Sequence, residues 1–263
     1  MRTVAQTVLR KAGLLEDEDK FSYRYWKHKR NESGLSLFLR RVCRKTAQSV
    51  FGSRWYGGHK AGEFASRYVV EHIVRSIKGS KEEEAVGILS ESIETANRKL
   101  KEYADAHQQM RGMGTTIVAA VIQGRTLLVA NVGDSRLYIV GDEITQVTQD
   151  HSLVQEMVRL GQMDPQSAKN HPDKNIITRA VGVSEKVKID IFERQLRAGE
   201  YIILCSDGLT NMVEDSVILQ ILHGAGSLSD KAERLIELAN KNGGKDNITV
   251  IIIEPNSDEV AEC

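Results

Sequence analysis

The chain has 263 residues, with 36 basic and 36 acidic side chains, and 41% of its residues are hydrophobic. This length predicts one large domain or two small ones with a substantial core. No apolar run approaches the ~20 residues of a transmembrane helix, and the first residues lack a signal-peptide core. Three cysteines at unrelated spacings form neither a disulfide framework nor a zinc knuckle. We therefore expect a cytoplasmic protein.

The charge is distributed unevenly along the chain. Residues 1–56 carry 13 Lys and Arg against 5 Asp and Glu, and the remaining residues carry 23 against 31, so the two parts have net charges of +8 and −8. A basic arm is typical of nucleic-acid or membrane binding. Residues 9–56, however, show no persistent helical or strand period, no regular aromatic platform and no known binding motif. Nucleic-acid binding is therefore the weakest of the three functions that we consider for this chain; the other two are introduced below.

Beyond Gly57 the pattern becomes regular, with helices first, strands in the middle, and helices again before a last strand. That order indicates an α+β fold with mostly antiparallel sheets. Helices are expected over residues 61–77, 81–103, 152–160, 217–222 and 231–240. Strands are expected over residues 115–122, 126–132, 137–140, 143–147, 186–192, 201–205 and 248–253. Asp150 or Ser152 is a plausible cap for the third helix, and the polar stretch that follows this helix predicts an irregular surface excursion.

Three aspartates lie where predicted strands end. Asp134 and Asp207 each follow an apolar strand, and Asp246 precedes the last one. Carboxylates beside glycines can gather as oxygen ligands for Mg²⁺ or Mn²⁺, and two such ions can clamp a phosphoryl group. The alternative is that each is an ordinary turn residue, with Asp134 paired to Arg136. Taken singly, these positions do not decide between the two.

Seven stretches between Gly57 and Glu254 resemble, in order, the metal-dependent protein serine/threonine phosphatases of type 2C, the PPM family, in its compact bacterial form. They are GGHKAGE (57–63), GMGTT (112–116), VGDSR (132–136), TQDHSLV (148–154), TRAVG (178–182), LCSDGL (204–209) and KDNITV (245–250). The resemblance implies a four-layer α-β-β-α sandwich, in which two antiparallel sheets are flanked by helices and the metals lie in a cleft at one end.

The resemblance also assigns roles to individual residues. Asp207 resembles a ligand of the central metal pair, Asp246 a second ligand to one of those ions, and Asp134 a ligand of a third, weaker metal. Residues 150–182 resemble a mobile flap that covers the cleft. His59 is placed where it could contact substrate, although a surface or packing role is as good an interpretation.

The implied activity is hydrolysis of phosphoserine and phosphothreonine in proteins by a metal-bridged hydroxide, with two or three Mn²⁺ or Mg²⁺ ions and no covalent intermediate. The implied partners are phosphorylated proteins and a cognate serine/threonine kinase. We expect no nucleic-acid or membrane partner and a monomeric protein.

The N-terminal part departs from the family pattern. Before His59 the family has Asp-Gly-Met-Gly-Gly, whose Asp bridges both central ions, whereas this chain has Arg54 at the position of that Asp. An earlier family motif, Arg-x-x-Asn-Glu-Asp-x-Phe, is half present. Asp19 and its neighbour Glu18 match and make Asp19 a candidate metal ligand, but Leu14 stands where the motif has Arg.

A shifted reading frame explains this departure. The codons TTG GTA GCC GAT GGT ATG GGG encode Leu-Val-Ala-Asp-Gly-Met-Gly. Preceded by one T and read from it, they encode the seven residues of Phe51 to Gly57 in order. We therefore interpret residues 1–56 as an aberrant basic segment in place of the first strands and the metal motif, out of frame over much of 8–56. Residues 57–263 form the phosphatase-like domain. We expect residues 20–54 to be irregular, because a sequence without a period cannot fill a close-packed sandwich.

Two main hypotheses follow for the chain as written. It is either a phosphatase with doubtful activity or a catalytically dead, phosphatase-like protein that binds phosphoproteins.

The coding DNA tests the frame hypothesis. Sequencing the gene across codons 8–58 should reveal a compensating pair of shifts that restores an Asp-Gly-Met-Gly motif at positions 54–57. A gene in which no such pair restores the motif would refute it.

Overall fold

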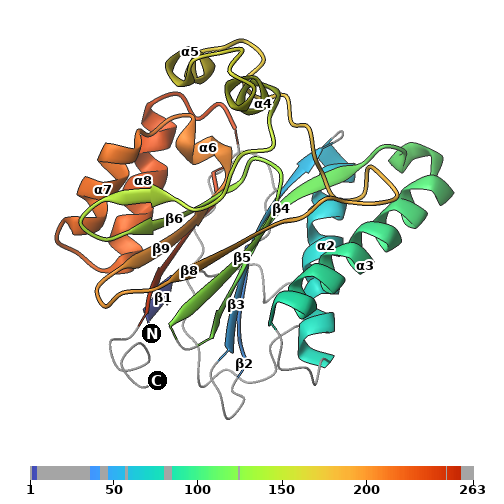
Figure 1. The fold of residues 1–263 in the computed structure, drawn as a ribbon, viewed down its shortest axis with the longest axis horizontal. Helices are drawn as coiled ribbons and strands as arrows, with labels where there is room; N and C mark the ends of the chain where they lie inside the picture. The colour runs from blue at the N-terminus through green and yellow to red at the C-terminus, as the bar shows by residue number, and fades with distance from the viewer. Residues whose placement is uncertain are drawn as a thin grey trace.

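The computed structural model describes residues 2–4, 36–41, 47–56, 59–79, 85–123, 125–246 and 248–255. These residues form two five-stranded sheets that face each other, and helices cover the outer face of each sheet (Figure 1). Every pair of neighbouring strands is antiparallel. The expected four-layer α-β-β-α sandwich is confirmed.

The strands divide between the sheets in a simple way. The first sheet has the order β2 (Ser36–Arg41), β3 (Ala47–Tyr56), β4 (Gly114–Gln123), β5 (Thr126–Val132) and β8 (Asp190–Gln195). The second has the order β1 (Arg2–Val4), β10 (Val250–Glu254), β9 (Tyr201–Cys205), β6 (Arg136–Val140) and β7 (Ile144–Gln146). The hairpins predicted at β4–β5 and β6–β7 are both present.

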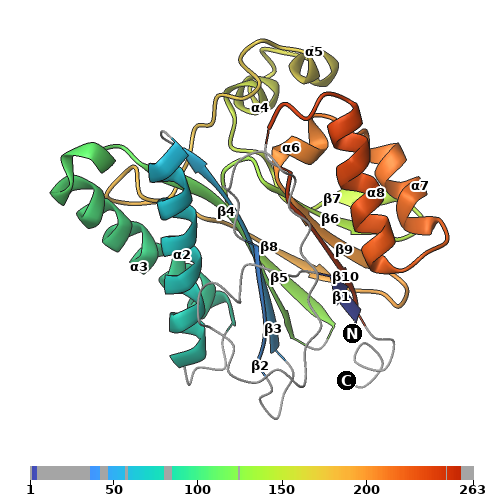
Figure 2. The ribbon, with the colours of Figure 1, turned by 180° about the vertical axis from the view of Figure 1, so that it is seen from behind.

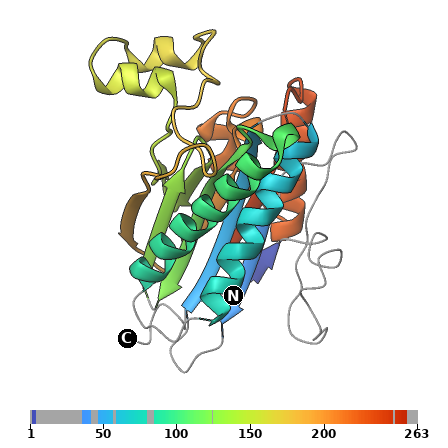
Figure 3. The ribbon, with the colours of Figure 1, turned by 90° about the vertical axis from the view of Figure 1, so that its right-hand side faces the viewer.

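The helices form the outer layers and the flap. The pair α2 (His59–Gly79) and α3 (Ala85–Ala106) covers the first sheet, and α7 (Asp215–His223) and α8 (Leu228–Lys241) cover the second. A short η1 (Gln108–Met110) follows α3, and a short α6 (Asp207–Thr210) follows β9. The remaining two, α4 (Leu153–Arg159) and α5 (Pro165–Lys169), project beyond one end of the sandwich (Figure 3).

Strict alternation of side chains builds the core. Along β4, Ile117, Ala119 and Val121 contribute to the cluster beneath α2 and α3, while the intervening Val118 and Ala120 lie between the two sheets. Strand β10 follows the same rule, with alternate residues in the helix-facing and inter-sheet clusters. Because successive strand residues point to opposite faces, a strand buried on both sides is apolar throughout.

One expectation about the N-terminal segment is wrong. Residues 36–41 and 47–56 are strands rather than irregular chain, and β3 pairs with β4 from Ala47↔Gln123 to Tyr56↔Gly114 (Figure 2). Backbone hydrogen bonds do not depend on side-chain identity, so a β-prone run can add to a sheet without an apolar period. Residues 2–4 form β1, and the rest of the segment, including Asp19, lies outside the described residues.

Two expectations in the flap region also need correction. The strand expected at 186–192 begins only at Asp190, because Asp190 pairs with Asn131 and β5 offers almost no partner beyond that point. The polar excursion contains the helix α5, whose first turn is capped by the Asp164 carboxylate. The cap of α4 is Ser152, one of the two predicted candidates.

None of the helices within the described ranges is both long enough and apolar enough to cross a membrane.

The inter-sheet cluster should contribute strongly to the free energy of unfolding. Ile251 on β10 is fully buried in it, so Ile251→Ala is expected to lower the free energy of unfolding by about 2–5 kcal/mol through lost burial and a residual cavity. Urea unfolding gives the value. The control Leu160→Ala, at a side chain 58% exposed, should change it by no more than about 0.5 kcal/mol. Equal losses in the two variants would contradict this packing.

Candidate functional site

Asp134 lies in the loop that carries the chain from β5 in one sheet to β6 in the other. The residue before it, Gly133, has φ +117°, and a Cβ there would lie 2.3 Å from the Thr116 Cβ. Only glycine fits this close approach without strain. The loop is also tied to β4 by a 3.1 Å contact between the hydroxyls of Ser135 and Thr116. As a result Asp134, although in a loop, is only 4% exposed.

Asp207 reaches the same end of the sandwich from β9. It is the first residue of α6 and is 6% exposed. Strand β6 pairs with β9 through Arg136↔Cys205, so the residues just before β6 and just after β9 leave the sheet at the same edge. The Asn211 side chain donates a 3.0 Å hydrogen bond to Asp207 Oδ2. Two buried carboxylates from distant parts of the chain therefore belong to one edge.

Asp246 lies in the turn before β10 at this edge. Ser206 and Thr249 join β9 to the start of β10, because each backbone N–H donates to the other residue, at 3.1 Å to Thr249 O and 3.0 Å to Ser206 Oγ. Asp246 precedes Thr249 by three residues and is exposed. The three predicted aspartates thus lie in segments that leave one end of the second sheet, two of them buried and one exposed.

His151 holds the Asp134 loop from the flap side. Its backbone N–H donates to Gly133 O at 2.9 Å, and its Nδ1 accepts from Gly133 N–H at 3.0 Å. The ring proton therefore lies on Nε2, which donates to Asp190 Oδ2 at 3.0 Å. Arg179 Nη1 in turn donates to Asp190 Oδ1 at 2.6 Å. This chain of contacts connects the loop to β8 and to the end of the flap.

The pKa of His151 is lowered from its ordinary value of 6.5. Burial disfavours the charged imidazolium and outweighs the opposing hydrogen bond to Asp190. The side chain is 5% exposed. A neutral ring is also what the geometry needs, since a protonated Nδ1 could not accept from Gly133.

The simplest alternative for Asp134 assigned its carboxylate to Arg136. The Arg136 guanidinium instead forms a two-pronged ion pair with Asp150, with Nε donating to Oδ1 at 2.9 Å and Nη2 donating to Oδ2 at 2.7 Å. Its Nη1 donates to the Tyr138 hydroxyl at 2.9 Å. Arg136 therefore binds Asp150, the first residue of the flap, rather than Asp134.

For two other residues that the sequence analysis singled out, His59 and Arg54, the structure describes only the backbone. His59 is the first residue of α2, just beyond the end of β3 at Tyr56, and only its backbone is described. Arg54 lies on β3 in register with Thr116, the residue that contacts Gly133 from β4. Neighbouring strands are about 4.8 Å apart, so the backbone of Arg54 lies at the edge where Asp134 is found.

These residues fit a divalent metal centre only in part. Buried carboxylate oxygens at Asp134 and Asp207 are the donors that Mg²⁺ and Mn²⁺ prefer. Within the part of the chain that the structure describes, however, no three His, Cys, Asp or Glu side chains gather closely enough to hold a metal ion. The residue at the position where the resemblance implies a bridging carboxylate is Arg54.

Sequence reasoning did not find the supporting contacts of His151, Asp190 and Arg179. These residues are up to 39 positions apart, and no spacing rule relates them. The only available signal was that His151 and Arg179 fall within two of the family-like stretches, TQDHSLV and TRAVG.

The buried His151 predicts a pH-dependent stability. Below pH 6.5 the unfolded chain takes up a proton that the folded protein resists, so folding stability should fall as the pH drops through 6.5 toward the lowered folded pKa. His151→Asn retains an acceptor for Gly133 but cannot titrate. Urea unfolding between about pH 8 and about pH 5 should show a shallower decline for this variant. The control His171→Asn, at a flap histidine whose side chain is 29% exposed, should decline like the unaltered chain. A parallel decline in all three would contradict this origin.

Comparisons with known proteins agree with this geometry. A family model described as Protein phosphatase 2C matches residues 28–248. Among curated proteins, the chain is 42% identical over 209 residues to the serine/threonine phosphatase stp of Listeria innocua, a match that covers 76% of this chain and 81% of that protein. It is 36% identical over 207 residues to the protein phosphatase PhpP of Streptococcus pneumoniae, covering 77% and 84%.

Solved structures show the same relationship in three dimensions. The S. agalactiae serine/threonine phosphatase superposes with a TM-score of 0.79 at 36% identity, covering 86% of this chain and 94% of that one. The catalytic domain of the serine/threonine phosphatase PstP, solved in complex with two manganese ions, gives a TM-score of 0.70 at 30% identity, covering 83% and 96%. The chain therefore belongs to the protein phosphatase 2C family of protein serine/threonine phosphatases.

Proposed function

We propose that this phosphatase acts at the end of the sandwich where Asp134 and Asp207 meet, on phosphoserine and phosphothreonine esters, with Mn²⁺ or Mg²⁺ as cofactor. The observation that carries the proposal is that two buried carboxylates, one just before β6 and one just after β9, leave the sheet beside the Arg136↔Cys205 pair. Carboxylate oxygens are the donors that Mg²⁺ and Mn²⁺ prefer. Asp246, at the same edge, is the proposed second ligand to one of the central ions.

Divalent ions, when bound, supply an activated water and neutralise charge that develops on the phosphoryl group. The chain's own residues hold and orient the donors. Asn211 fixes one oxygen of Asp207, and His151 fixes the backbone of the loop that carries Asp134. His59, at the start of α2, is retained as a candidate for substrate contact, and Asp19 as a further candidate ligand.

The polypeptide as written is proposed to have strongly reduced activity because position 54 carries arginine. A guanidinium repels divalent cations where a bridging carboxylate should attract them. We attribute this to the frame shift over much of residues 8–56, so that residues 1–56 are an aberrant segment and residues 57–263 the phosphatase unit, with residues 150–182 as its flap. The alternative is a catalytically dead chain that retains the fold and binds phosphoproteins.

Proposed substrates are phosphorylated proteins, opposed by a cognate serine/threonine kinase. We also propose a monomeric, cytoplasmic protein.

Restoring the reading frame tests the proposal. Phosphate release from a phosphothreonine peptide with Mn²⁺ should be at least about a thousandfold faster for a frame-restored chain than for the chain as written, because metal ions contribute several kcal/mol of transition-state stabilisation. In the restored chain, Asp207→Asn should remove most of this rate. The matched control Asp215→Asn, which changes the same charge at an exposed position, should retain it.

Family-like turnover by the chain as written would show that a carboxylate at position 54 is dispensable. Equal, negligible rates in both chains would favour the phosphoprotein-binding alternative.

A further inference from the structure

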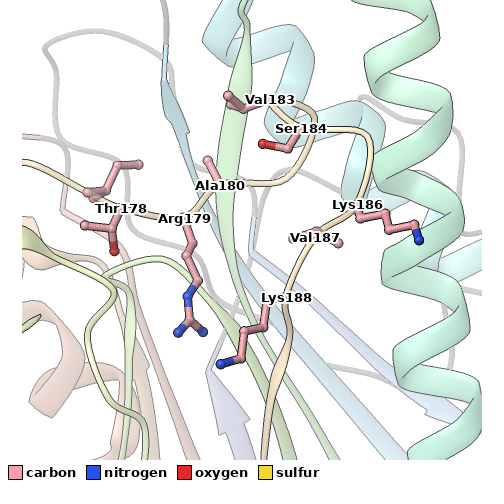
Figure 4. Close-up of a pocket in the computed structure, with 9 residues that line it drawn as sticks. Thr178, Arg179, Ala180, Val183, Ser184, Lys186, Val187 and Lys188 are labelled. Carbon is pink, nitrogen blue, oxygen red and sulfur yellow. The ribbon is translucent and has the colours of Figure 1, made fainter.

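A cavity of about 290 Å³ lies where the flap returns to the sandwich (Figure 4). This volume is at the lower end of the ~300–1,000 Å³ typical of small-molecule pockets, so it suits one or two side chains rather than a large cofactor. The lining residues are Ile177, Thr178, Arg179, Ala180, Val183, Ser184, Lys186, Val187 and Lys188. All belong to a single stretch that runs from the end of the flap to the start of β8.

The charged residues that line this cavity are all basic. Arg179, Lys186 and Lys188 line it, and none of its described lining residues is acidic. The head groups of Arg179 and Lys188 lie near each other in the view of Figure 4. Arg179 Nη1 donates to Asp190 and lies 3.1 Å from His151 Nε2, while both lysines are exposed. Glu185 adjoins Lys186 in sequence but does not line the cavity.

The positive field of this cluster extends onto the flap. The pKa of Glu156 on α4 is lowered mainly by its partner Arg159, and Arg179 and Lys188 add to the effect. The field of Arg179 and Lys188 therefore still acts on a carboxylate outside the cavity.

The rest of the lining suits a peptide. Ala180, Val183 and Val187 provide apolar surface, and Val183 is 42% exposed although it is apolar. Thr178 and Ser184 contribute hydroxyl groups that can donate or accept hydrogen bonds. An occupant with acidic head groups on a short aliphatic stem would match both parts of this lining.

The cavity is connected to the proposed active end by direct contacts. Arg179 Nη1 lies 3.1 Å from His151 Nε2, and Thr178 N–H donates to His151 O at 2.8 Å. His151 in turn holds Gly133, the neighbour of Asp134. A peptide residue in the cavity would therefore lie within a few residues of a phosphorylated side chain at Asp134 and Asp207.

We propose that this cavity binds acidic side chains that flank the phosphorylated residue of the substrate, so that Lys186 and Lys188 favour phosphoproteins with acidic sequence around the phosphosite. This inference rests on the proposed function for the identity of the substrate, but binding can be measured without hydrolysis.

The test uses fluorescence anisotropy with the full chain at low salt and without added metal. The probes are two labelled phosphothreonine peptides, one with three glutamates on each side of the phosphothreonine and one with glutamines at the same positions. The acidic peptide should bind about five- to tenfold more tightly, as expected for two exposed charge pairs. The preference should shrink at high salt, which screens exposed charges.

The decisive variant is Lys186→Glu with Lys188→Glu, which should abolish or reverse the preference. The matched control is Arg125→Glu with Lys241→Glu, which makes the same change in net charge at exposed positions in the β4–β5 turn and at the end of α8. It should keep the preference. If both double variants lost the preference for the acidic peptide equally, net charge rather than the cavity would explain it, and the proposal would be wrong. A preference retained by Lys186→Glu/Lys188→Glu would also overturn the proposal. Failure of hydrolysis in the frame-restored chain leaves this binding result unaffected.

Discussion

The antiparallel register between β6 and β9 is the constraint on which the candidate site depends. Arg136 and Cys205 are partners, so the residues that precede β6 and follow β9 leave the sheet at one edge and opposite each other. Asp134 and Asp207, 73 positions apart in the chain, each lie two residues beyond this pair, at the same edge of the sheet. A slip of one residue would reverse which face each side chain occupies and separate the two carboxylates.

The loop that carries Asp134 illustrates how the fold keeps a carboxylate in a buried position. Gly133 permits the close approach to Thr116, and His151 accepts from and donates to its backbone. Asp190 and Arg179 then orient the His151 ring. Burial of a carboxylate at this point is consistent with a functional site, because it costs free energy that packing alone does not require.

In the N-terminal strands, the hydrogen bonds of the sheet come from the backbone, whereas metal binding would depend on the side chains. Strand β3 pairs along its full length with β4 although its sequence has no apolar period, because ladder hydrogen bonds are made by the main chain. Metal chemistry depends on the side chain, and a guanidinium at position 54 cannot replace a carboxylate. The expectation of irregular structure therefore failed for residues 36–41 and 47–54, whereas the effect of Arg54 on metal binding stays a prediction.

Local period, turn chemistry and short motifs were enough to predict the main helices and strands after Gly57, two hairpins and the family, and to narrow the cap of α4 to Asp150 or Ser152. They also placed the three aspartates at strand ends. Three features required the folded arrangement: Asp134 and Asp207 leave the sheet at one edge, Arg136 pairs with Asp150, and the strand after the flap begins at Asp190. Each of these depends on register between strands distant in the chain, which local sequence does not encode.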